Sequence, residues 1–280
     1  MIYEFTTLSK NTITRIVFGW IFCVLIYQLC NNLMLHQLQD PVLIQTDLDL
    51  SYWAVFYSEI PAFINANFIA SISFDSVLFL LFIATIIFPE KQLLRISSTI
   101  LFFLYVVQLN TFMCWHYHNL MPLILILFPL CFKNVLSFSI LFKALRYFVL
   151  FIYGSAAIWK LVRGSVFNHG QMNWIIDSNF KERISNTNYE LNIFEDFILM
   201  IGNHPELAQI ILVLGILIEF IFLIGFFTTK YDLFLIILAI LFHIGTSILV
   251  DVSFVQLWIL FLTLVPFSKI NLPRLGFHQN

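Results

Sequence analysis

Charged side chains are scarce in this sequence. Asp, Glu, Lys and Arg make up 11% of its 280 residues, whereas an ordinary soluble domain has about 25%. Hydrophobic residues make up 60% of the chain, and the mean hydropathy is +0.92. This composition excludes a soluble enzyme, because a compact soluble domain could not bury so much apolar surface. It also excludes a disordered chain, which needs high charge and few aromatic residues.

Several other residue types are also few. The 14 basic residues do not outnumber the 16 acidic ones, so the basic stripe of a nucleic-acid-binding protein is missing. Four cysteines, with no C-x-x-C pair, do not form a disulfide scaffold. Nine glycines and eight prolines argue against the broken helix pairs of many transporters. Transport therefore stays the weakest alternative, in which Glu219 would carry protons.

Long apolar runs are what the sequence does contain. Runs of about twenty residues predict membrane-spanning helices. The sequence therefore predicts an all-α polytopic membrane helix bundle in the cytoplasmic (inner) membrane. The first run lacks a small-residue cleavage site and is predicted to be a retained signal anchor. The eight predicted spans are about 13–35, 68–88, 93–113, 119–133, 139–162, 207–227, 231–250 and 252–267.

The positive charges alternate between the loops that join these runs. Ten of the 14 basic residues fall in one set of loops, which the positive-inside rule assigns to the cytoplasm. Both termini are therefore predicted to be cytoplasmic, and the loops 36–67 and 163–206 are predicted to face outward. The loop 163–206 mixes aromatic and charged residues, so we predict an amphipathic interfacial segment or a lid there.

Ionisable residues inside spans are costly and usually face the bundle interior or a watery cavity. Lys160 and Arg163 lie three residues apart and share a helix face, near the predicted outer end of a span. An amine in such a place is a candidate general base. The alternative is a pair of side chains that extend to the lipid head groups. The full set of candidates is Asp75, His118, Arg146, Lys160, Glu219, His243 and Asp251.

Three of these candidates have two interpretations each. His118 ends the segment Trp115–His118, where an H-x-H pair on a helix points apart, so a hydrogen-bonded histidine is favoured and no metal site is predicted. His243 is either a site residue or a hydrogen-bonding group between helices. Glu219 is protonated, or paired with Arg146 or with a backbone group, and acts either as a structural contact or as a proton relay.

Three segments occur in an order that is characteristic of one membrane family. They are Trp115–His118, the helix end Tyr153–Leu161 with Gly170–Met172 downstream, and Phe242–His243 with the run that ends at Val265–Phe267. Together they span 113–268. The chain resembles the horizontally transferred transmembrane (HTTM) family, which includes the membrane part of vitamin K-dependent gamma-glutamyl carboxylase. This family has two consecutive lysines at the helix end, whereas this sequence has Trp159 in the first position.

The resemblance implies a chemistry for these positions. Lys160 would be the base that deprotonates a reduced quinone of the menaquinone or vitamin K type. The oxidised species would then take a proton from a glutamate side chain of a peptide, and carbon dioxide would add. His118 and His243 would orient or polarise the quinone oxygen. The residues implied to bind the cofactor are Trp115, Trp159, Arg163 and Phe242.

Short family members lack the large soluble region of the carboxylase. They include the bacterial sporulation-delaying toxin maturation protein B, which works with partners to produce a secreted peptide toxin. The resemblance thus implies one HTTM-like domain over 1–280 that modifies or helps mature a secreted peptide at the extracytoplasmic side. Membrane lipids, the peptide and accessory maturation proteins are the expected partners, with no nucleic acid. The alternative is a non-catalytic or immunity-type membrane protein that binds another chain through 163–206.

Overall fold

The computed structural model describes residues 5–38, 57–112, 120–184, 193–250 and 255–267. All regular elements in these ranges are helices, which confirms the predicted all-α class. The chain forms two compact units. Residues 1–145 and 266–280 form the first unit, and residues 146–265 form the second.

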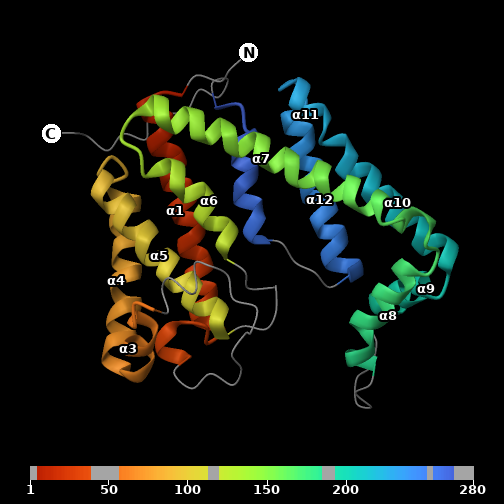
Figure 1. Ribbon diagram of the computed structural model, residues 1–280, viewed down its shortest axis with the longest axis horizontal. Coiled ribbons are helices and arrows are strands. Elements are labelled where there is room, and N and C mark those ends of the chain that lie inside the picture. Colours follow the sequence, from red (N-terminus) through yellow and green to blue (C-terminus); the bar gives the residue numbers. More distant parts are fainter. Residues whose placement is uncertain (1–4, 39–56, 113–119, 185–192, 251–254, 268–280) are drawn as a thin grey trace. The chain divides into compact units, whose positions relative to one another are not determined.

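The first unit is a bundle of helices (Figure 1). Its elements are α1 (Thr7–Cys30), the short η1 (Leu35–Gln37), α3 (Ile60–Ala66), α4 (Phe68–Ile87), α5 (Gln92–Phe112), α6 (Met121–Leu130) and the first part of α7 (Val135–Val162). Local sequence fixes where several of them begin. Thr6 and Ser9 form a capping box at α1, and the Asn67 side chain accepts hydrogen bonds from the first turn of α4. Such caps satisfy the orphan N–H groups of a helix start.

Six helical segments in the described ranges are long and apolar enough to cross a membrane. They are Thr7–Gln37, Phe68–Ile87, Gln92–Leu109, Val135–Val162, Pro205–Phe227 and Asp232–Val250. The two other segments among the eight predicted spans are shorter helices. α6 has 10 residues and is about 15 Å long at about 1.5 Å per residue. η4 (Val255–Leu264) is a 3₁₀-helix of 10 residues.

Two prolines explain why α6 is short. Pro122 stands in its first turn, and Pro129 lies one residue before its end. A proline fits the first turn of a helix, but further along it removes one backbone hydrogen bond and clashes with the preceding turn. The sequence 119–133 is therefore apolar enough for a span, while its helix covers about half of a bilayer core of about 30 Å.

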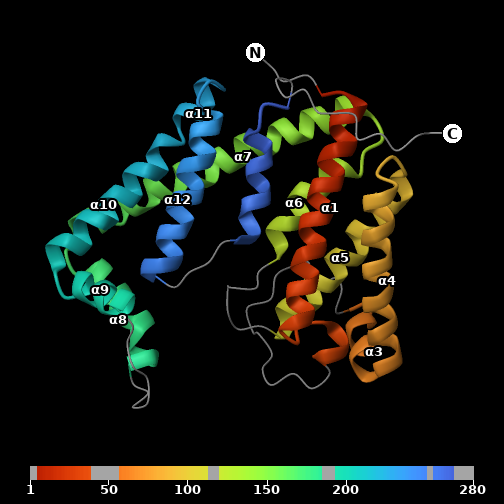
Figure 2. The same cartoon turned by 180° about the vertical axis from the view of Figure 1, so that it is seen from behind.

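Aromatic rings join α1, α4 and α5 side by side (Figures 1 and 2). The centroids of Phe18 and Phe82 are 5.2 Å apart, and those of Phe82 and Phe102 are 5.7 Å apart. Near the same level, the hydroxyl groups of Thr85 and Ser98 are hydrogen-bonded at 2.9 Å. The Ser98 hydroxyl also lies 3.2 Å from the carbonyl oxygen of Leu81 on α4. The core of this unit is thus a layer of aromatic rings, beside which hydroxyl groups join α4 and α5.

Buried cations hold the C-terminal end of α6. Arg95 Nε donates to the carbonyl of Leu130 at 2.6 Å, and Lys10 Nζ donates to the carbonyls of Phe132 and Lys133. Lys10 and Arg95 are 3% and 2% exposed. Because the last carbonyls of a helix are unpaired and carry partial negative charge, these cations replace the missing backbone donors. Lys10, Arg95 and the 130–133 turn, all predicted to be cytoplasmic, therefore lie at one end of this unit.

The opposite end of the first unit contains a buried carboxylate. Asp75 Oδ2 accepts hydrogen bonds from the backbone N–H of His36 at 3.0 Å and from its Nδ1 at 2.7 Å. Tyr105 donates its hydroxyl hydrogen to the carbonyl of Leu33 at 3.0 Å. Asp75, which the sequence singled out as an intramembrane acid, thus fixes the chain that follows α1 against α4.

The second unit begins within α7. It contains η3 (Ser165–Phe167), α8 (Gln171–Ile184), α9 (Ile193–Gly202), α10 (Pro205–Ile221), α11 (Ile224–Phe227), α12 (Asp232–Val250) and η4. The predicted outward loop 163–206 forms the helices α8 and α9. They pack on α10 through an apolar cluster of Met172, Ile176, Ile198, Ile201 and Ala208.

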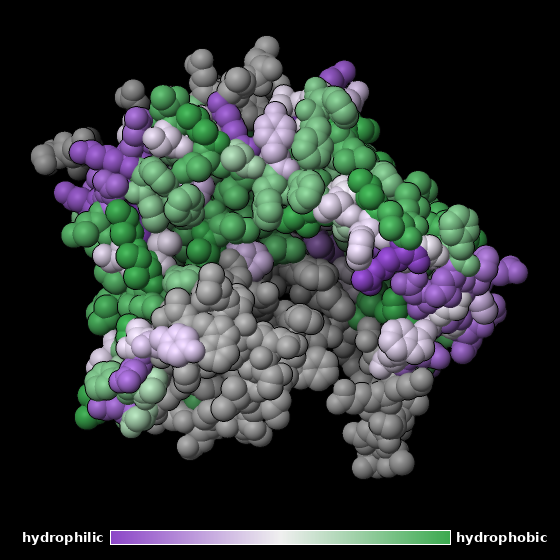
Figure 3. Space-filling view, viewed as in Figure 1, coloured by the Kyte–Doolittle hydropathy of each residue, from purple (hydrophilic) through white to green (hydrophobic). Residues whose placement is uncertain are grey.

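The surface of the described helices is largely hydrophobic, as expected for side chains that face lipid. Figure 3 shows hydrophobic side chains over much of the visible face, and hydrophilic ones gathered over α8 and α9. The helices themselves fit this distribution, because polar and charged residues occur along most of α8, whereas each span contains a long apolar stretch with few charges. The molecule is therefore an integral membrane protein with a more polar helical segment between two of its spans.

Candidate functional site

One face of α7 carries three polar contacts of the second unit. Arg146, Tyr153 and Lys160 follow one another at seven-residue intervals, which is close to two helical turns. Each of them bonds to a residue of the α10–α12 region. The spacing thus creates one stripe on α7 with three anchoring points.

Lys160 forms an ion pair with Glu219 of α10. The distance between Lys160 Nζ and Glu219 Oε1 is 2.5 Å, and the two side chains are 35% and 5% exposed. The ammonium also lies 5.9 Å from the centre of the Phe242 ring of α12. The Lys160 side chain therefore extends from α7 toward α10 and ends between Glu219 and Phe242.

Tyr153 joins α7 to α10 and α12 at the middle of the stripe. Its hydroxyl group and His243 Nε2 are hydrogen-bonded at 2.5 Å. Its ring stacks on Phe222 with centroids 4.0 Å apart and an interplanar angle of 14°. The His243 ring in turn stacks with the Phe261 ring, and their centroids are 6.0 Å apart. His243 is thus buried as a hydrogen-bonding group between helices, which is the structural interpretation that the sequence left open.

Arg146 forms the third anchor, at the beginning of α12. Its Nη2 and Nε atoms donate to the two carboxylate oxygens of Asp232 at 2.7 and 2.8 Å. Nη2 also donates to the carbonyls of Gly225 and Thr228, at 2.8 and 3.2 Å. Arg146 therefore closes the turn between α11 and α12, and the pairing of Arg146 with Glu219 that the sequence suggested as one option is wrong.

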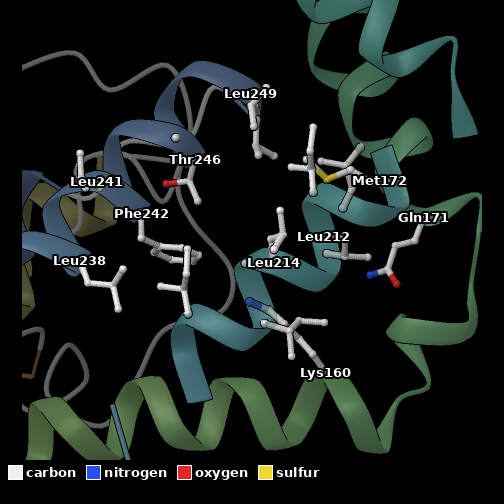
Figure 4. Close-up of a pocket in the computed structure, with 17 residues that line it drawn as sticks. Lys160, Gln171, Met172, Leu212, Leu214, Leu238, Leu241, Phe242, Thr246 and Leu249 are labelled. Carbon is white, nitrogen blue, oxygen red and sulfur yellow. The ribbon is translucent and has the colours of Figure 1, made fainter. Parts of the chain in front are cut away.

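A pocket of about 450 Å³ lies between α10 and α12 and reaches Lys160. Figure 4 shows the Lys160 side chain extending from α7 toward α10, with Phe242 and Thr246 of α12 nearby. Gln171 and Met172 of α8 line another part of the pocket. The remaining lining residues are mostly leucine and isoleucine. Such a space accepts an apolar body and offers few polar groups to orient it.

Two of the residues that line the pocket are exposed on the surface of the second unit. Leu214 of α10 and Leu241 of α12 line it and are 53% and 60% exposed, and both belong to spans. Two glycines widen the space between these spans. A Cβ atom added at Gly245 would meet no atom within 4 Å, and one at Gly215 would approach Phe242 at 3.5 Å.

The structure brings some of the predicted site residues together and separates others. Lys160 and Phe242 both line the pocket, whereas His243 bonds to Tyr153. The Arg163 guanidinium lies 4.5 Å from the centre of the Trp159 ring, and both side chains are exposed. That pair has the form expected of an interfacial anchor. His118, Trp115 and Asp251 lie outside the described residues.

The sequence did not identify Glu219 as the partner of Lys160. Lys160 was placed near the outer end of its span and Glu219 nearer the inner half. α7 has 28 residues and is about 42 Å long, which exceeds a bilayer core of about 30 Å, so position along this helix does not report depth. The heptad spacing of Arg146, Tyr153 and Lys160 was the available signal, since it predicts one shared face that needs partners.

We compared the chain with known protein families, proteins and structures. No protein-family model, no curated protein and no solved structure matches the chain. The site is therefore interpreted from its own residues.

Proposed function

We propose that this integral membrane protein has a function of the HTTM type. It would modify a secreted peptide, or help to mature it, at the extracytoplasmic side with a reduced quinone of the menaquinone or vitamin K type. One observation supports the proposal above others: Lys160 is an amine with a carboxylate partner, and it lines an apolar pocket between helices long and apolar enough to span a membrane.

The residues of the pocket fit such a cofactor. A quinone has a flat polar ring and a long apolar chain, and it resides in the bilayer. The volume of about 450 Å³ and the aliphatic lining suit the apolar part. Lys160 and Phe242 would lie at the ring, as a hydrogen-bond donor and an aromatic wall.

Lys160 and Glu219 would accept and transfer the hydroxyl proton of the cofactor. When bound, a reduced quinone would supply a hydroxyl proton and, once oxidised by dioxygen as co-substrate, the strong base that carboxylation of a peptide requires. Lys160 accepts a proton only as the neutral amine. At 2.5 Å from Nζ, Glu219 Oε1 can take the ammonium proton and so restore that amine. Tyr153 and His243 keep α7 against α12 and thereby hold the amine in place.

We expect Lys160→Met to reduce quinol-dependent incorporation of radiolabelled bicarbonate into peptide by about 100-fold or more, as for the loss of a general base. The assay uses spheroplasts that express the protein and are supplied with menaquinol. The matched control is Lys230→Met, which removes an exposed cation of the same unit and should leave incorporation within about twofold of wild type. Retained incorporation in Lys160→Met, or none in the wild type, would contradict the proposal.

An exposed apolar face on α9 favours a second function, in which the protein binds another chain without catalysis. Ile193, Phe197 and Met200 lie on this face and are exposed. Deleting the loop 163–206 would not separate the two functions, because Gln171, Met172 and Ile175 of α8 line the pocket. Phe197→Glu is the sharper variant. If it abolishes the cellular phenotype while Lys160→Met has no effect, the second function is the correct one.

A further inference from the structure

We propose that the Lys160 pocket takes a single-chain amphiphile with an uncharged head group from the bilayer, and that Glu219 sets this selectivity. The inference deepens the proposed function, since a reduced quinone is one such molecule. It concerns binding alone, however, so it can hold or fail independently of any reaction.

The first step of the argument is the charge at the head-group end. A lone lysine beside an apolar pocket would select an anionic head group, such as that of a fatty acid. Here Glu219 Oε1 already pairs with Lys160 Nζ at 2.5 Å, and the pair is neutral as a whole. A second anion at Nζ would lie close to the Glu219 carboxylate and be repelled by it.

The second step is the hydrogen-bonding capacity that remains on the Lys160 ammonium. An ammonium has three donors, and Glu219 accepts one of them. Lys160 can therefore donate to a hydroxyl or carbonyl oxygen of a ligand while it keeps its partner. An uncharged head group that accepts a hydrogen bond thus satisfies the site, and an anion does not.

The third step is the apolar part and the source of the ligand. The pocket extends along α10 and α12 past Gly215 and Gly245 and ends at residues such as Leu249. Leu214 and Leu241, which line it, are exposed on spans. A chain that lies between these helices would therefore exchange with the lipid around them rather than with water.

Two photoactivatable probes with the same alkyl chain test the selectivity. One is a long-chain alcohol, and the other is the matching alkyl sulfonate, which remains ionised at every working pH. Each is added to proteoliposomes of the full-length protein, and the labelled residues are mapped by mass spectrometry. In the wild type we expect the alcohol to label pocket residues of α10 and α12 about tenfold more than the sulfonate.

Variants of the ion pair should change this preference in a defined way. Glu219→Gln frees the charge of Lys160, so the sulfonate should become the preferred probe by about tenfold. The double variant Lys160→Met/Glu219→Gln has no charge at the site and should again prefer the alcohol. Gly245→Leu should fill the open space beside α12 and reduce both labels, whereas Gly19→Leu on α1, also at an open position, should reduce neither.

The outcomes separate the inference from its alternatives. Equal labelling of wild type by both probes, or an unchanged ratio in Glu219→Gln, would overturn the selectivity. Labelling that falls outside the pocket and is not reduced in Gly245→Leu would show that the probes do not bind at the proposed site. If the preference inverts as expected while bicarbonate incorporation is absent, the inference stands and the proposed reaction fails.

Discussion

Asp232→Ala is expected to lower the free energy of unfolding by about 3–5 kcal/mol, because it leaves the Arg146 guanidinium buried without its counter-ion. The two side chains are 4% and 1% exposed, so water does not replace the lost carboxylate. Arg146 would keep its bonds to the carbonyls of Gly225 and Thr228, which are neutral acceptors. The loss should be visible as a lower midpoint of denaturation in detergent, followed by circular dichroism.

Two further variants distinguish this mechanism from a general effect of substitution. Glu206→Ala removes an exposed acid from the first turn of α10 and should change the free energy of unfolding by about 0.5 kcal/mol or less. The double variant Arg146→Met/Asp232→Leu removes both charges and should recover most of the lost stability, since an apolar pair can replace a buried ion pair. A loss below about 1 kcal/mol in Asp232→Ala would show that the pair is dispensable.

The sequence predicted the class of the fold and most of its spans because lipid imposes a simple rule. A helix needs about twenty mostly apolar residues to cross the bilayer. The helices α1, α4, α5, α7, α10 and α12 are all long and apolar enough. Hydropathy did not show that the helix within the predicted span 119–133, α6, has only 10 residues, with a proline in its first turn and another one residue before its end. The division into two compact units was not predicted, since hydropathy reports burial in lipid and not which helices pack together.

The candidate site was predicted in its residue types and less well in its contacts. Lys160 was identified because an amine in an apolar segment is costly, and the structure gives it a buried partner. The family resemblance assigned His243 to the same site as Lys160. On α12, however, Phe242 and His243 are neighbours that point to different surroundings, one to the pocket and the other to Tyr153. The position of a residue along a helix does not determine the direction in which its side chain points. That direction relative to the neighbouring helices depends on how the helices pack.

Positive charge in the loops was interpreted as a signal of orientation, yet part of it has a structural role. Lys10 and Arg95 are buried, and they donate to carbonyls at the end of α6. A short helix that ends within an apolar bundle needs donors for its last carbonyls. The sequence does not show that these carbonyls need donors, because that requirement follows from where α6 ends in the folded chain. The same residues can thus set the orientation and complete the fold.

Arg95→Met is therefore expected to lower the free energy of unfolding by about 2–4 kcal/mol. Arg95 donates to the carbonyls of Leu130 and Pro89 and is 2% exposed. Methionine keeps much of the volume but donates no hydrogen bond, so both carbonyls would lose a donor at about 1–3 kcal/mol each. Removal of a buried charge offsets part of this cost.

The matched control is Lys91→Met, which removes an exposed cation four residues earlier in the same unit. If the positive charges at this end acted through orientation alone, both variants would disturb insertion to a similar extent and neither would change the stability of correctly inserted protein. If Arg95 caps α6, its variant loses stability after insertion, while Lys91→Met stays within about 0.5 kcal/mol of wild type. Denaturation in detergent and hydrogen exchange at the amides of α6 measure the difference, and equal stability of both variants would exclude the capping role.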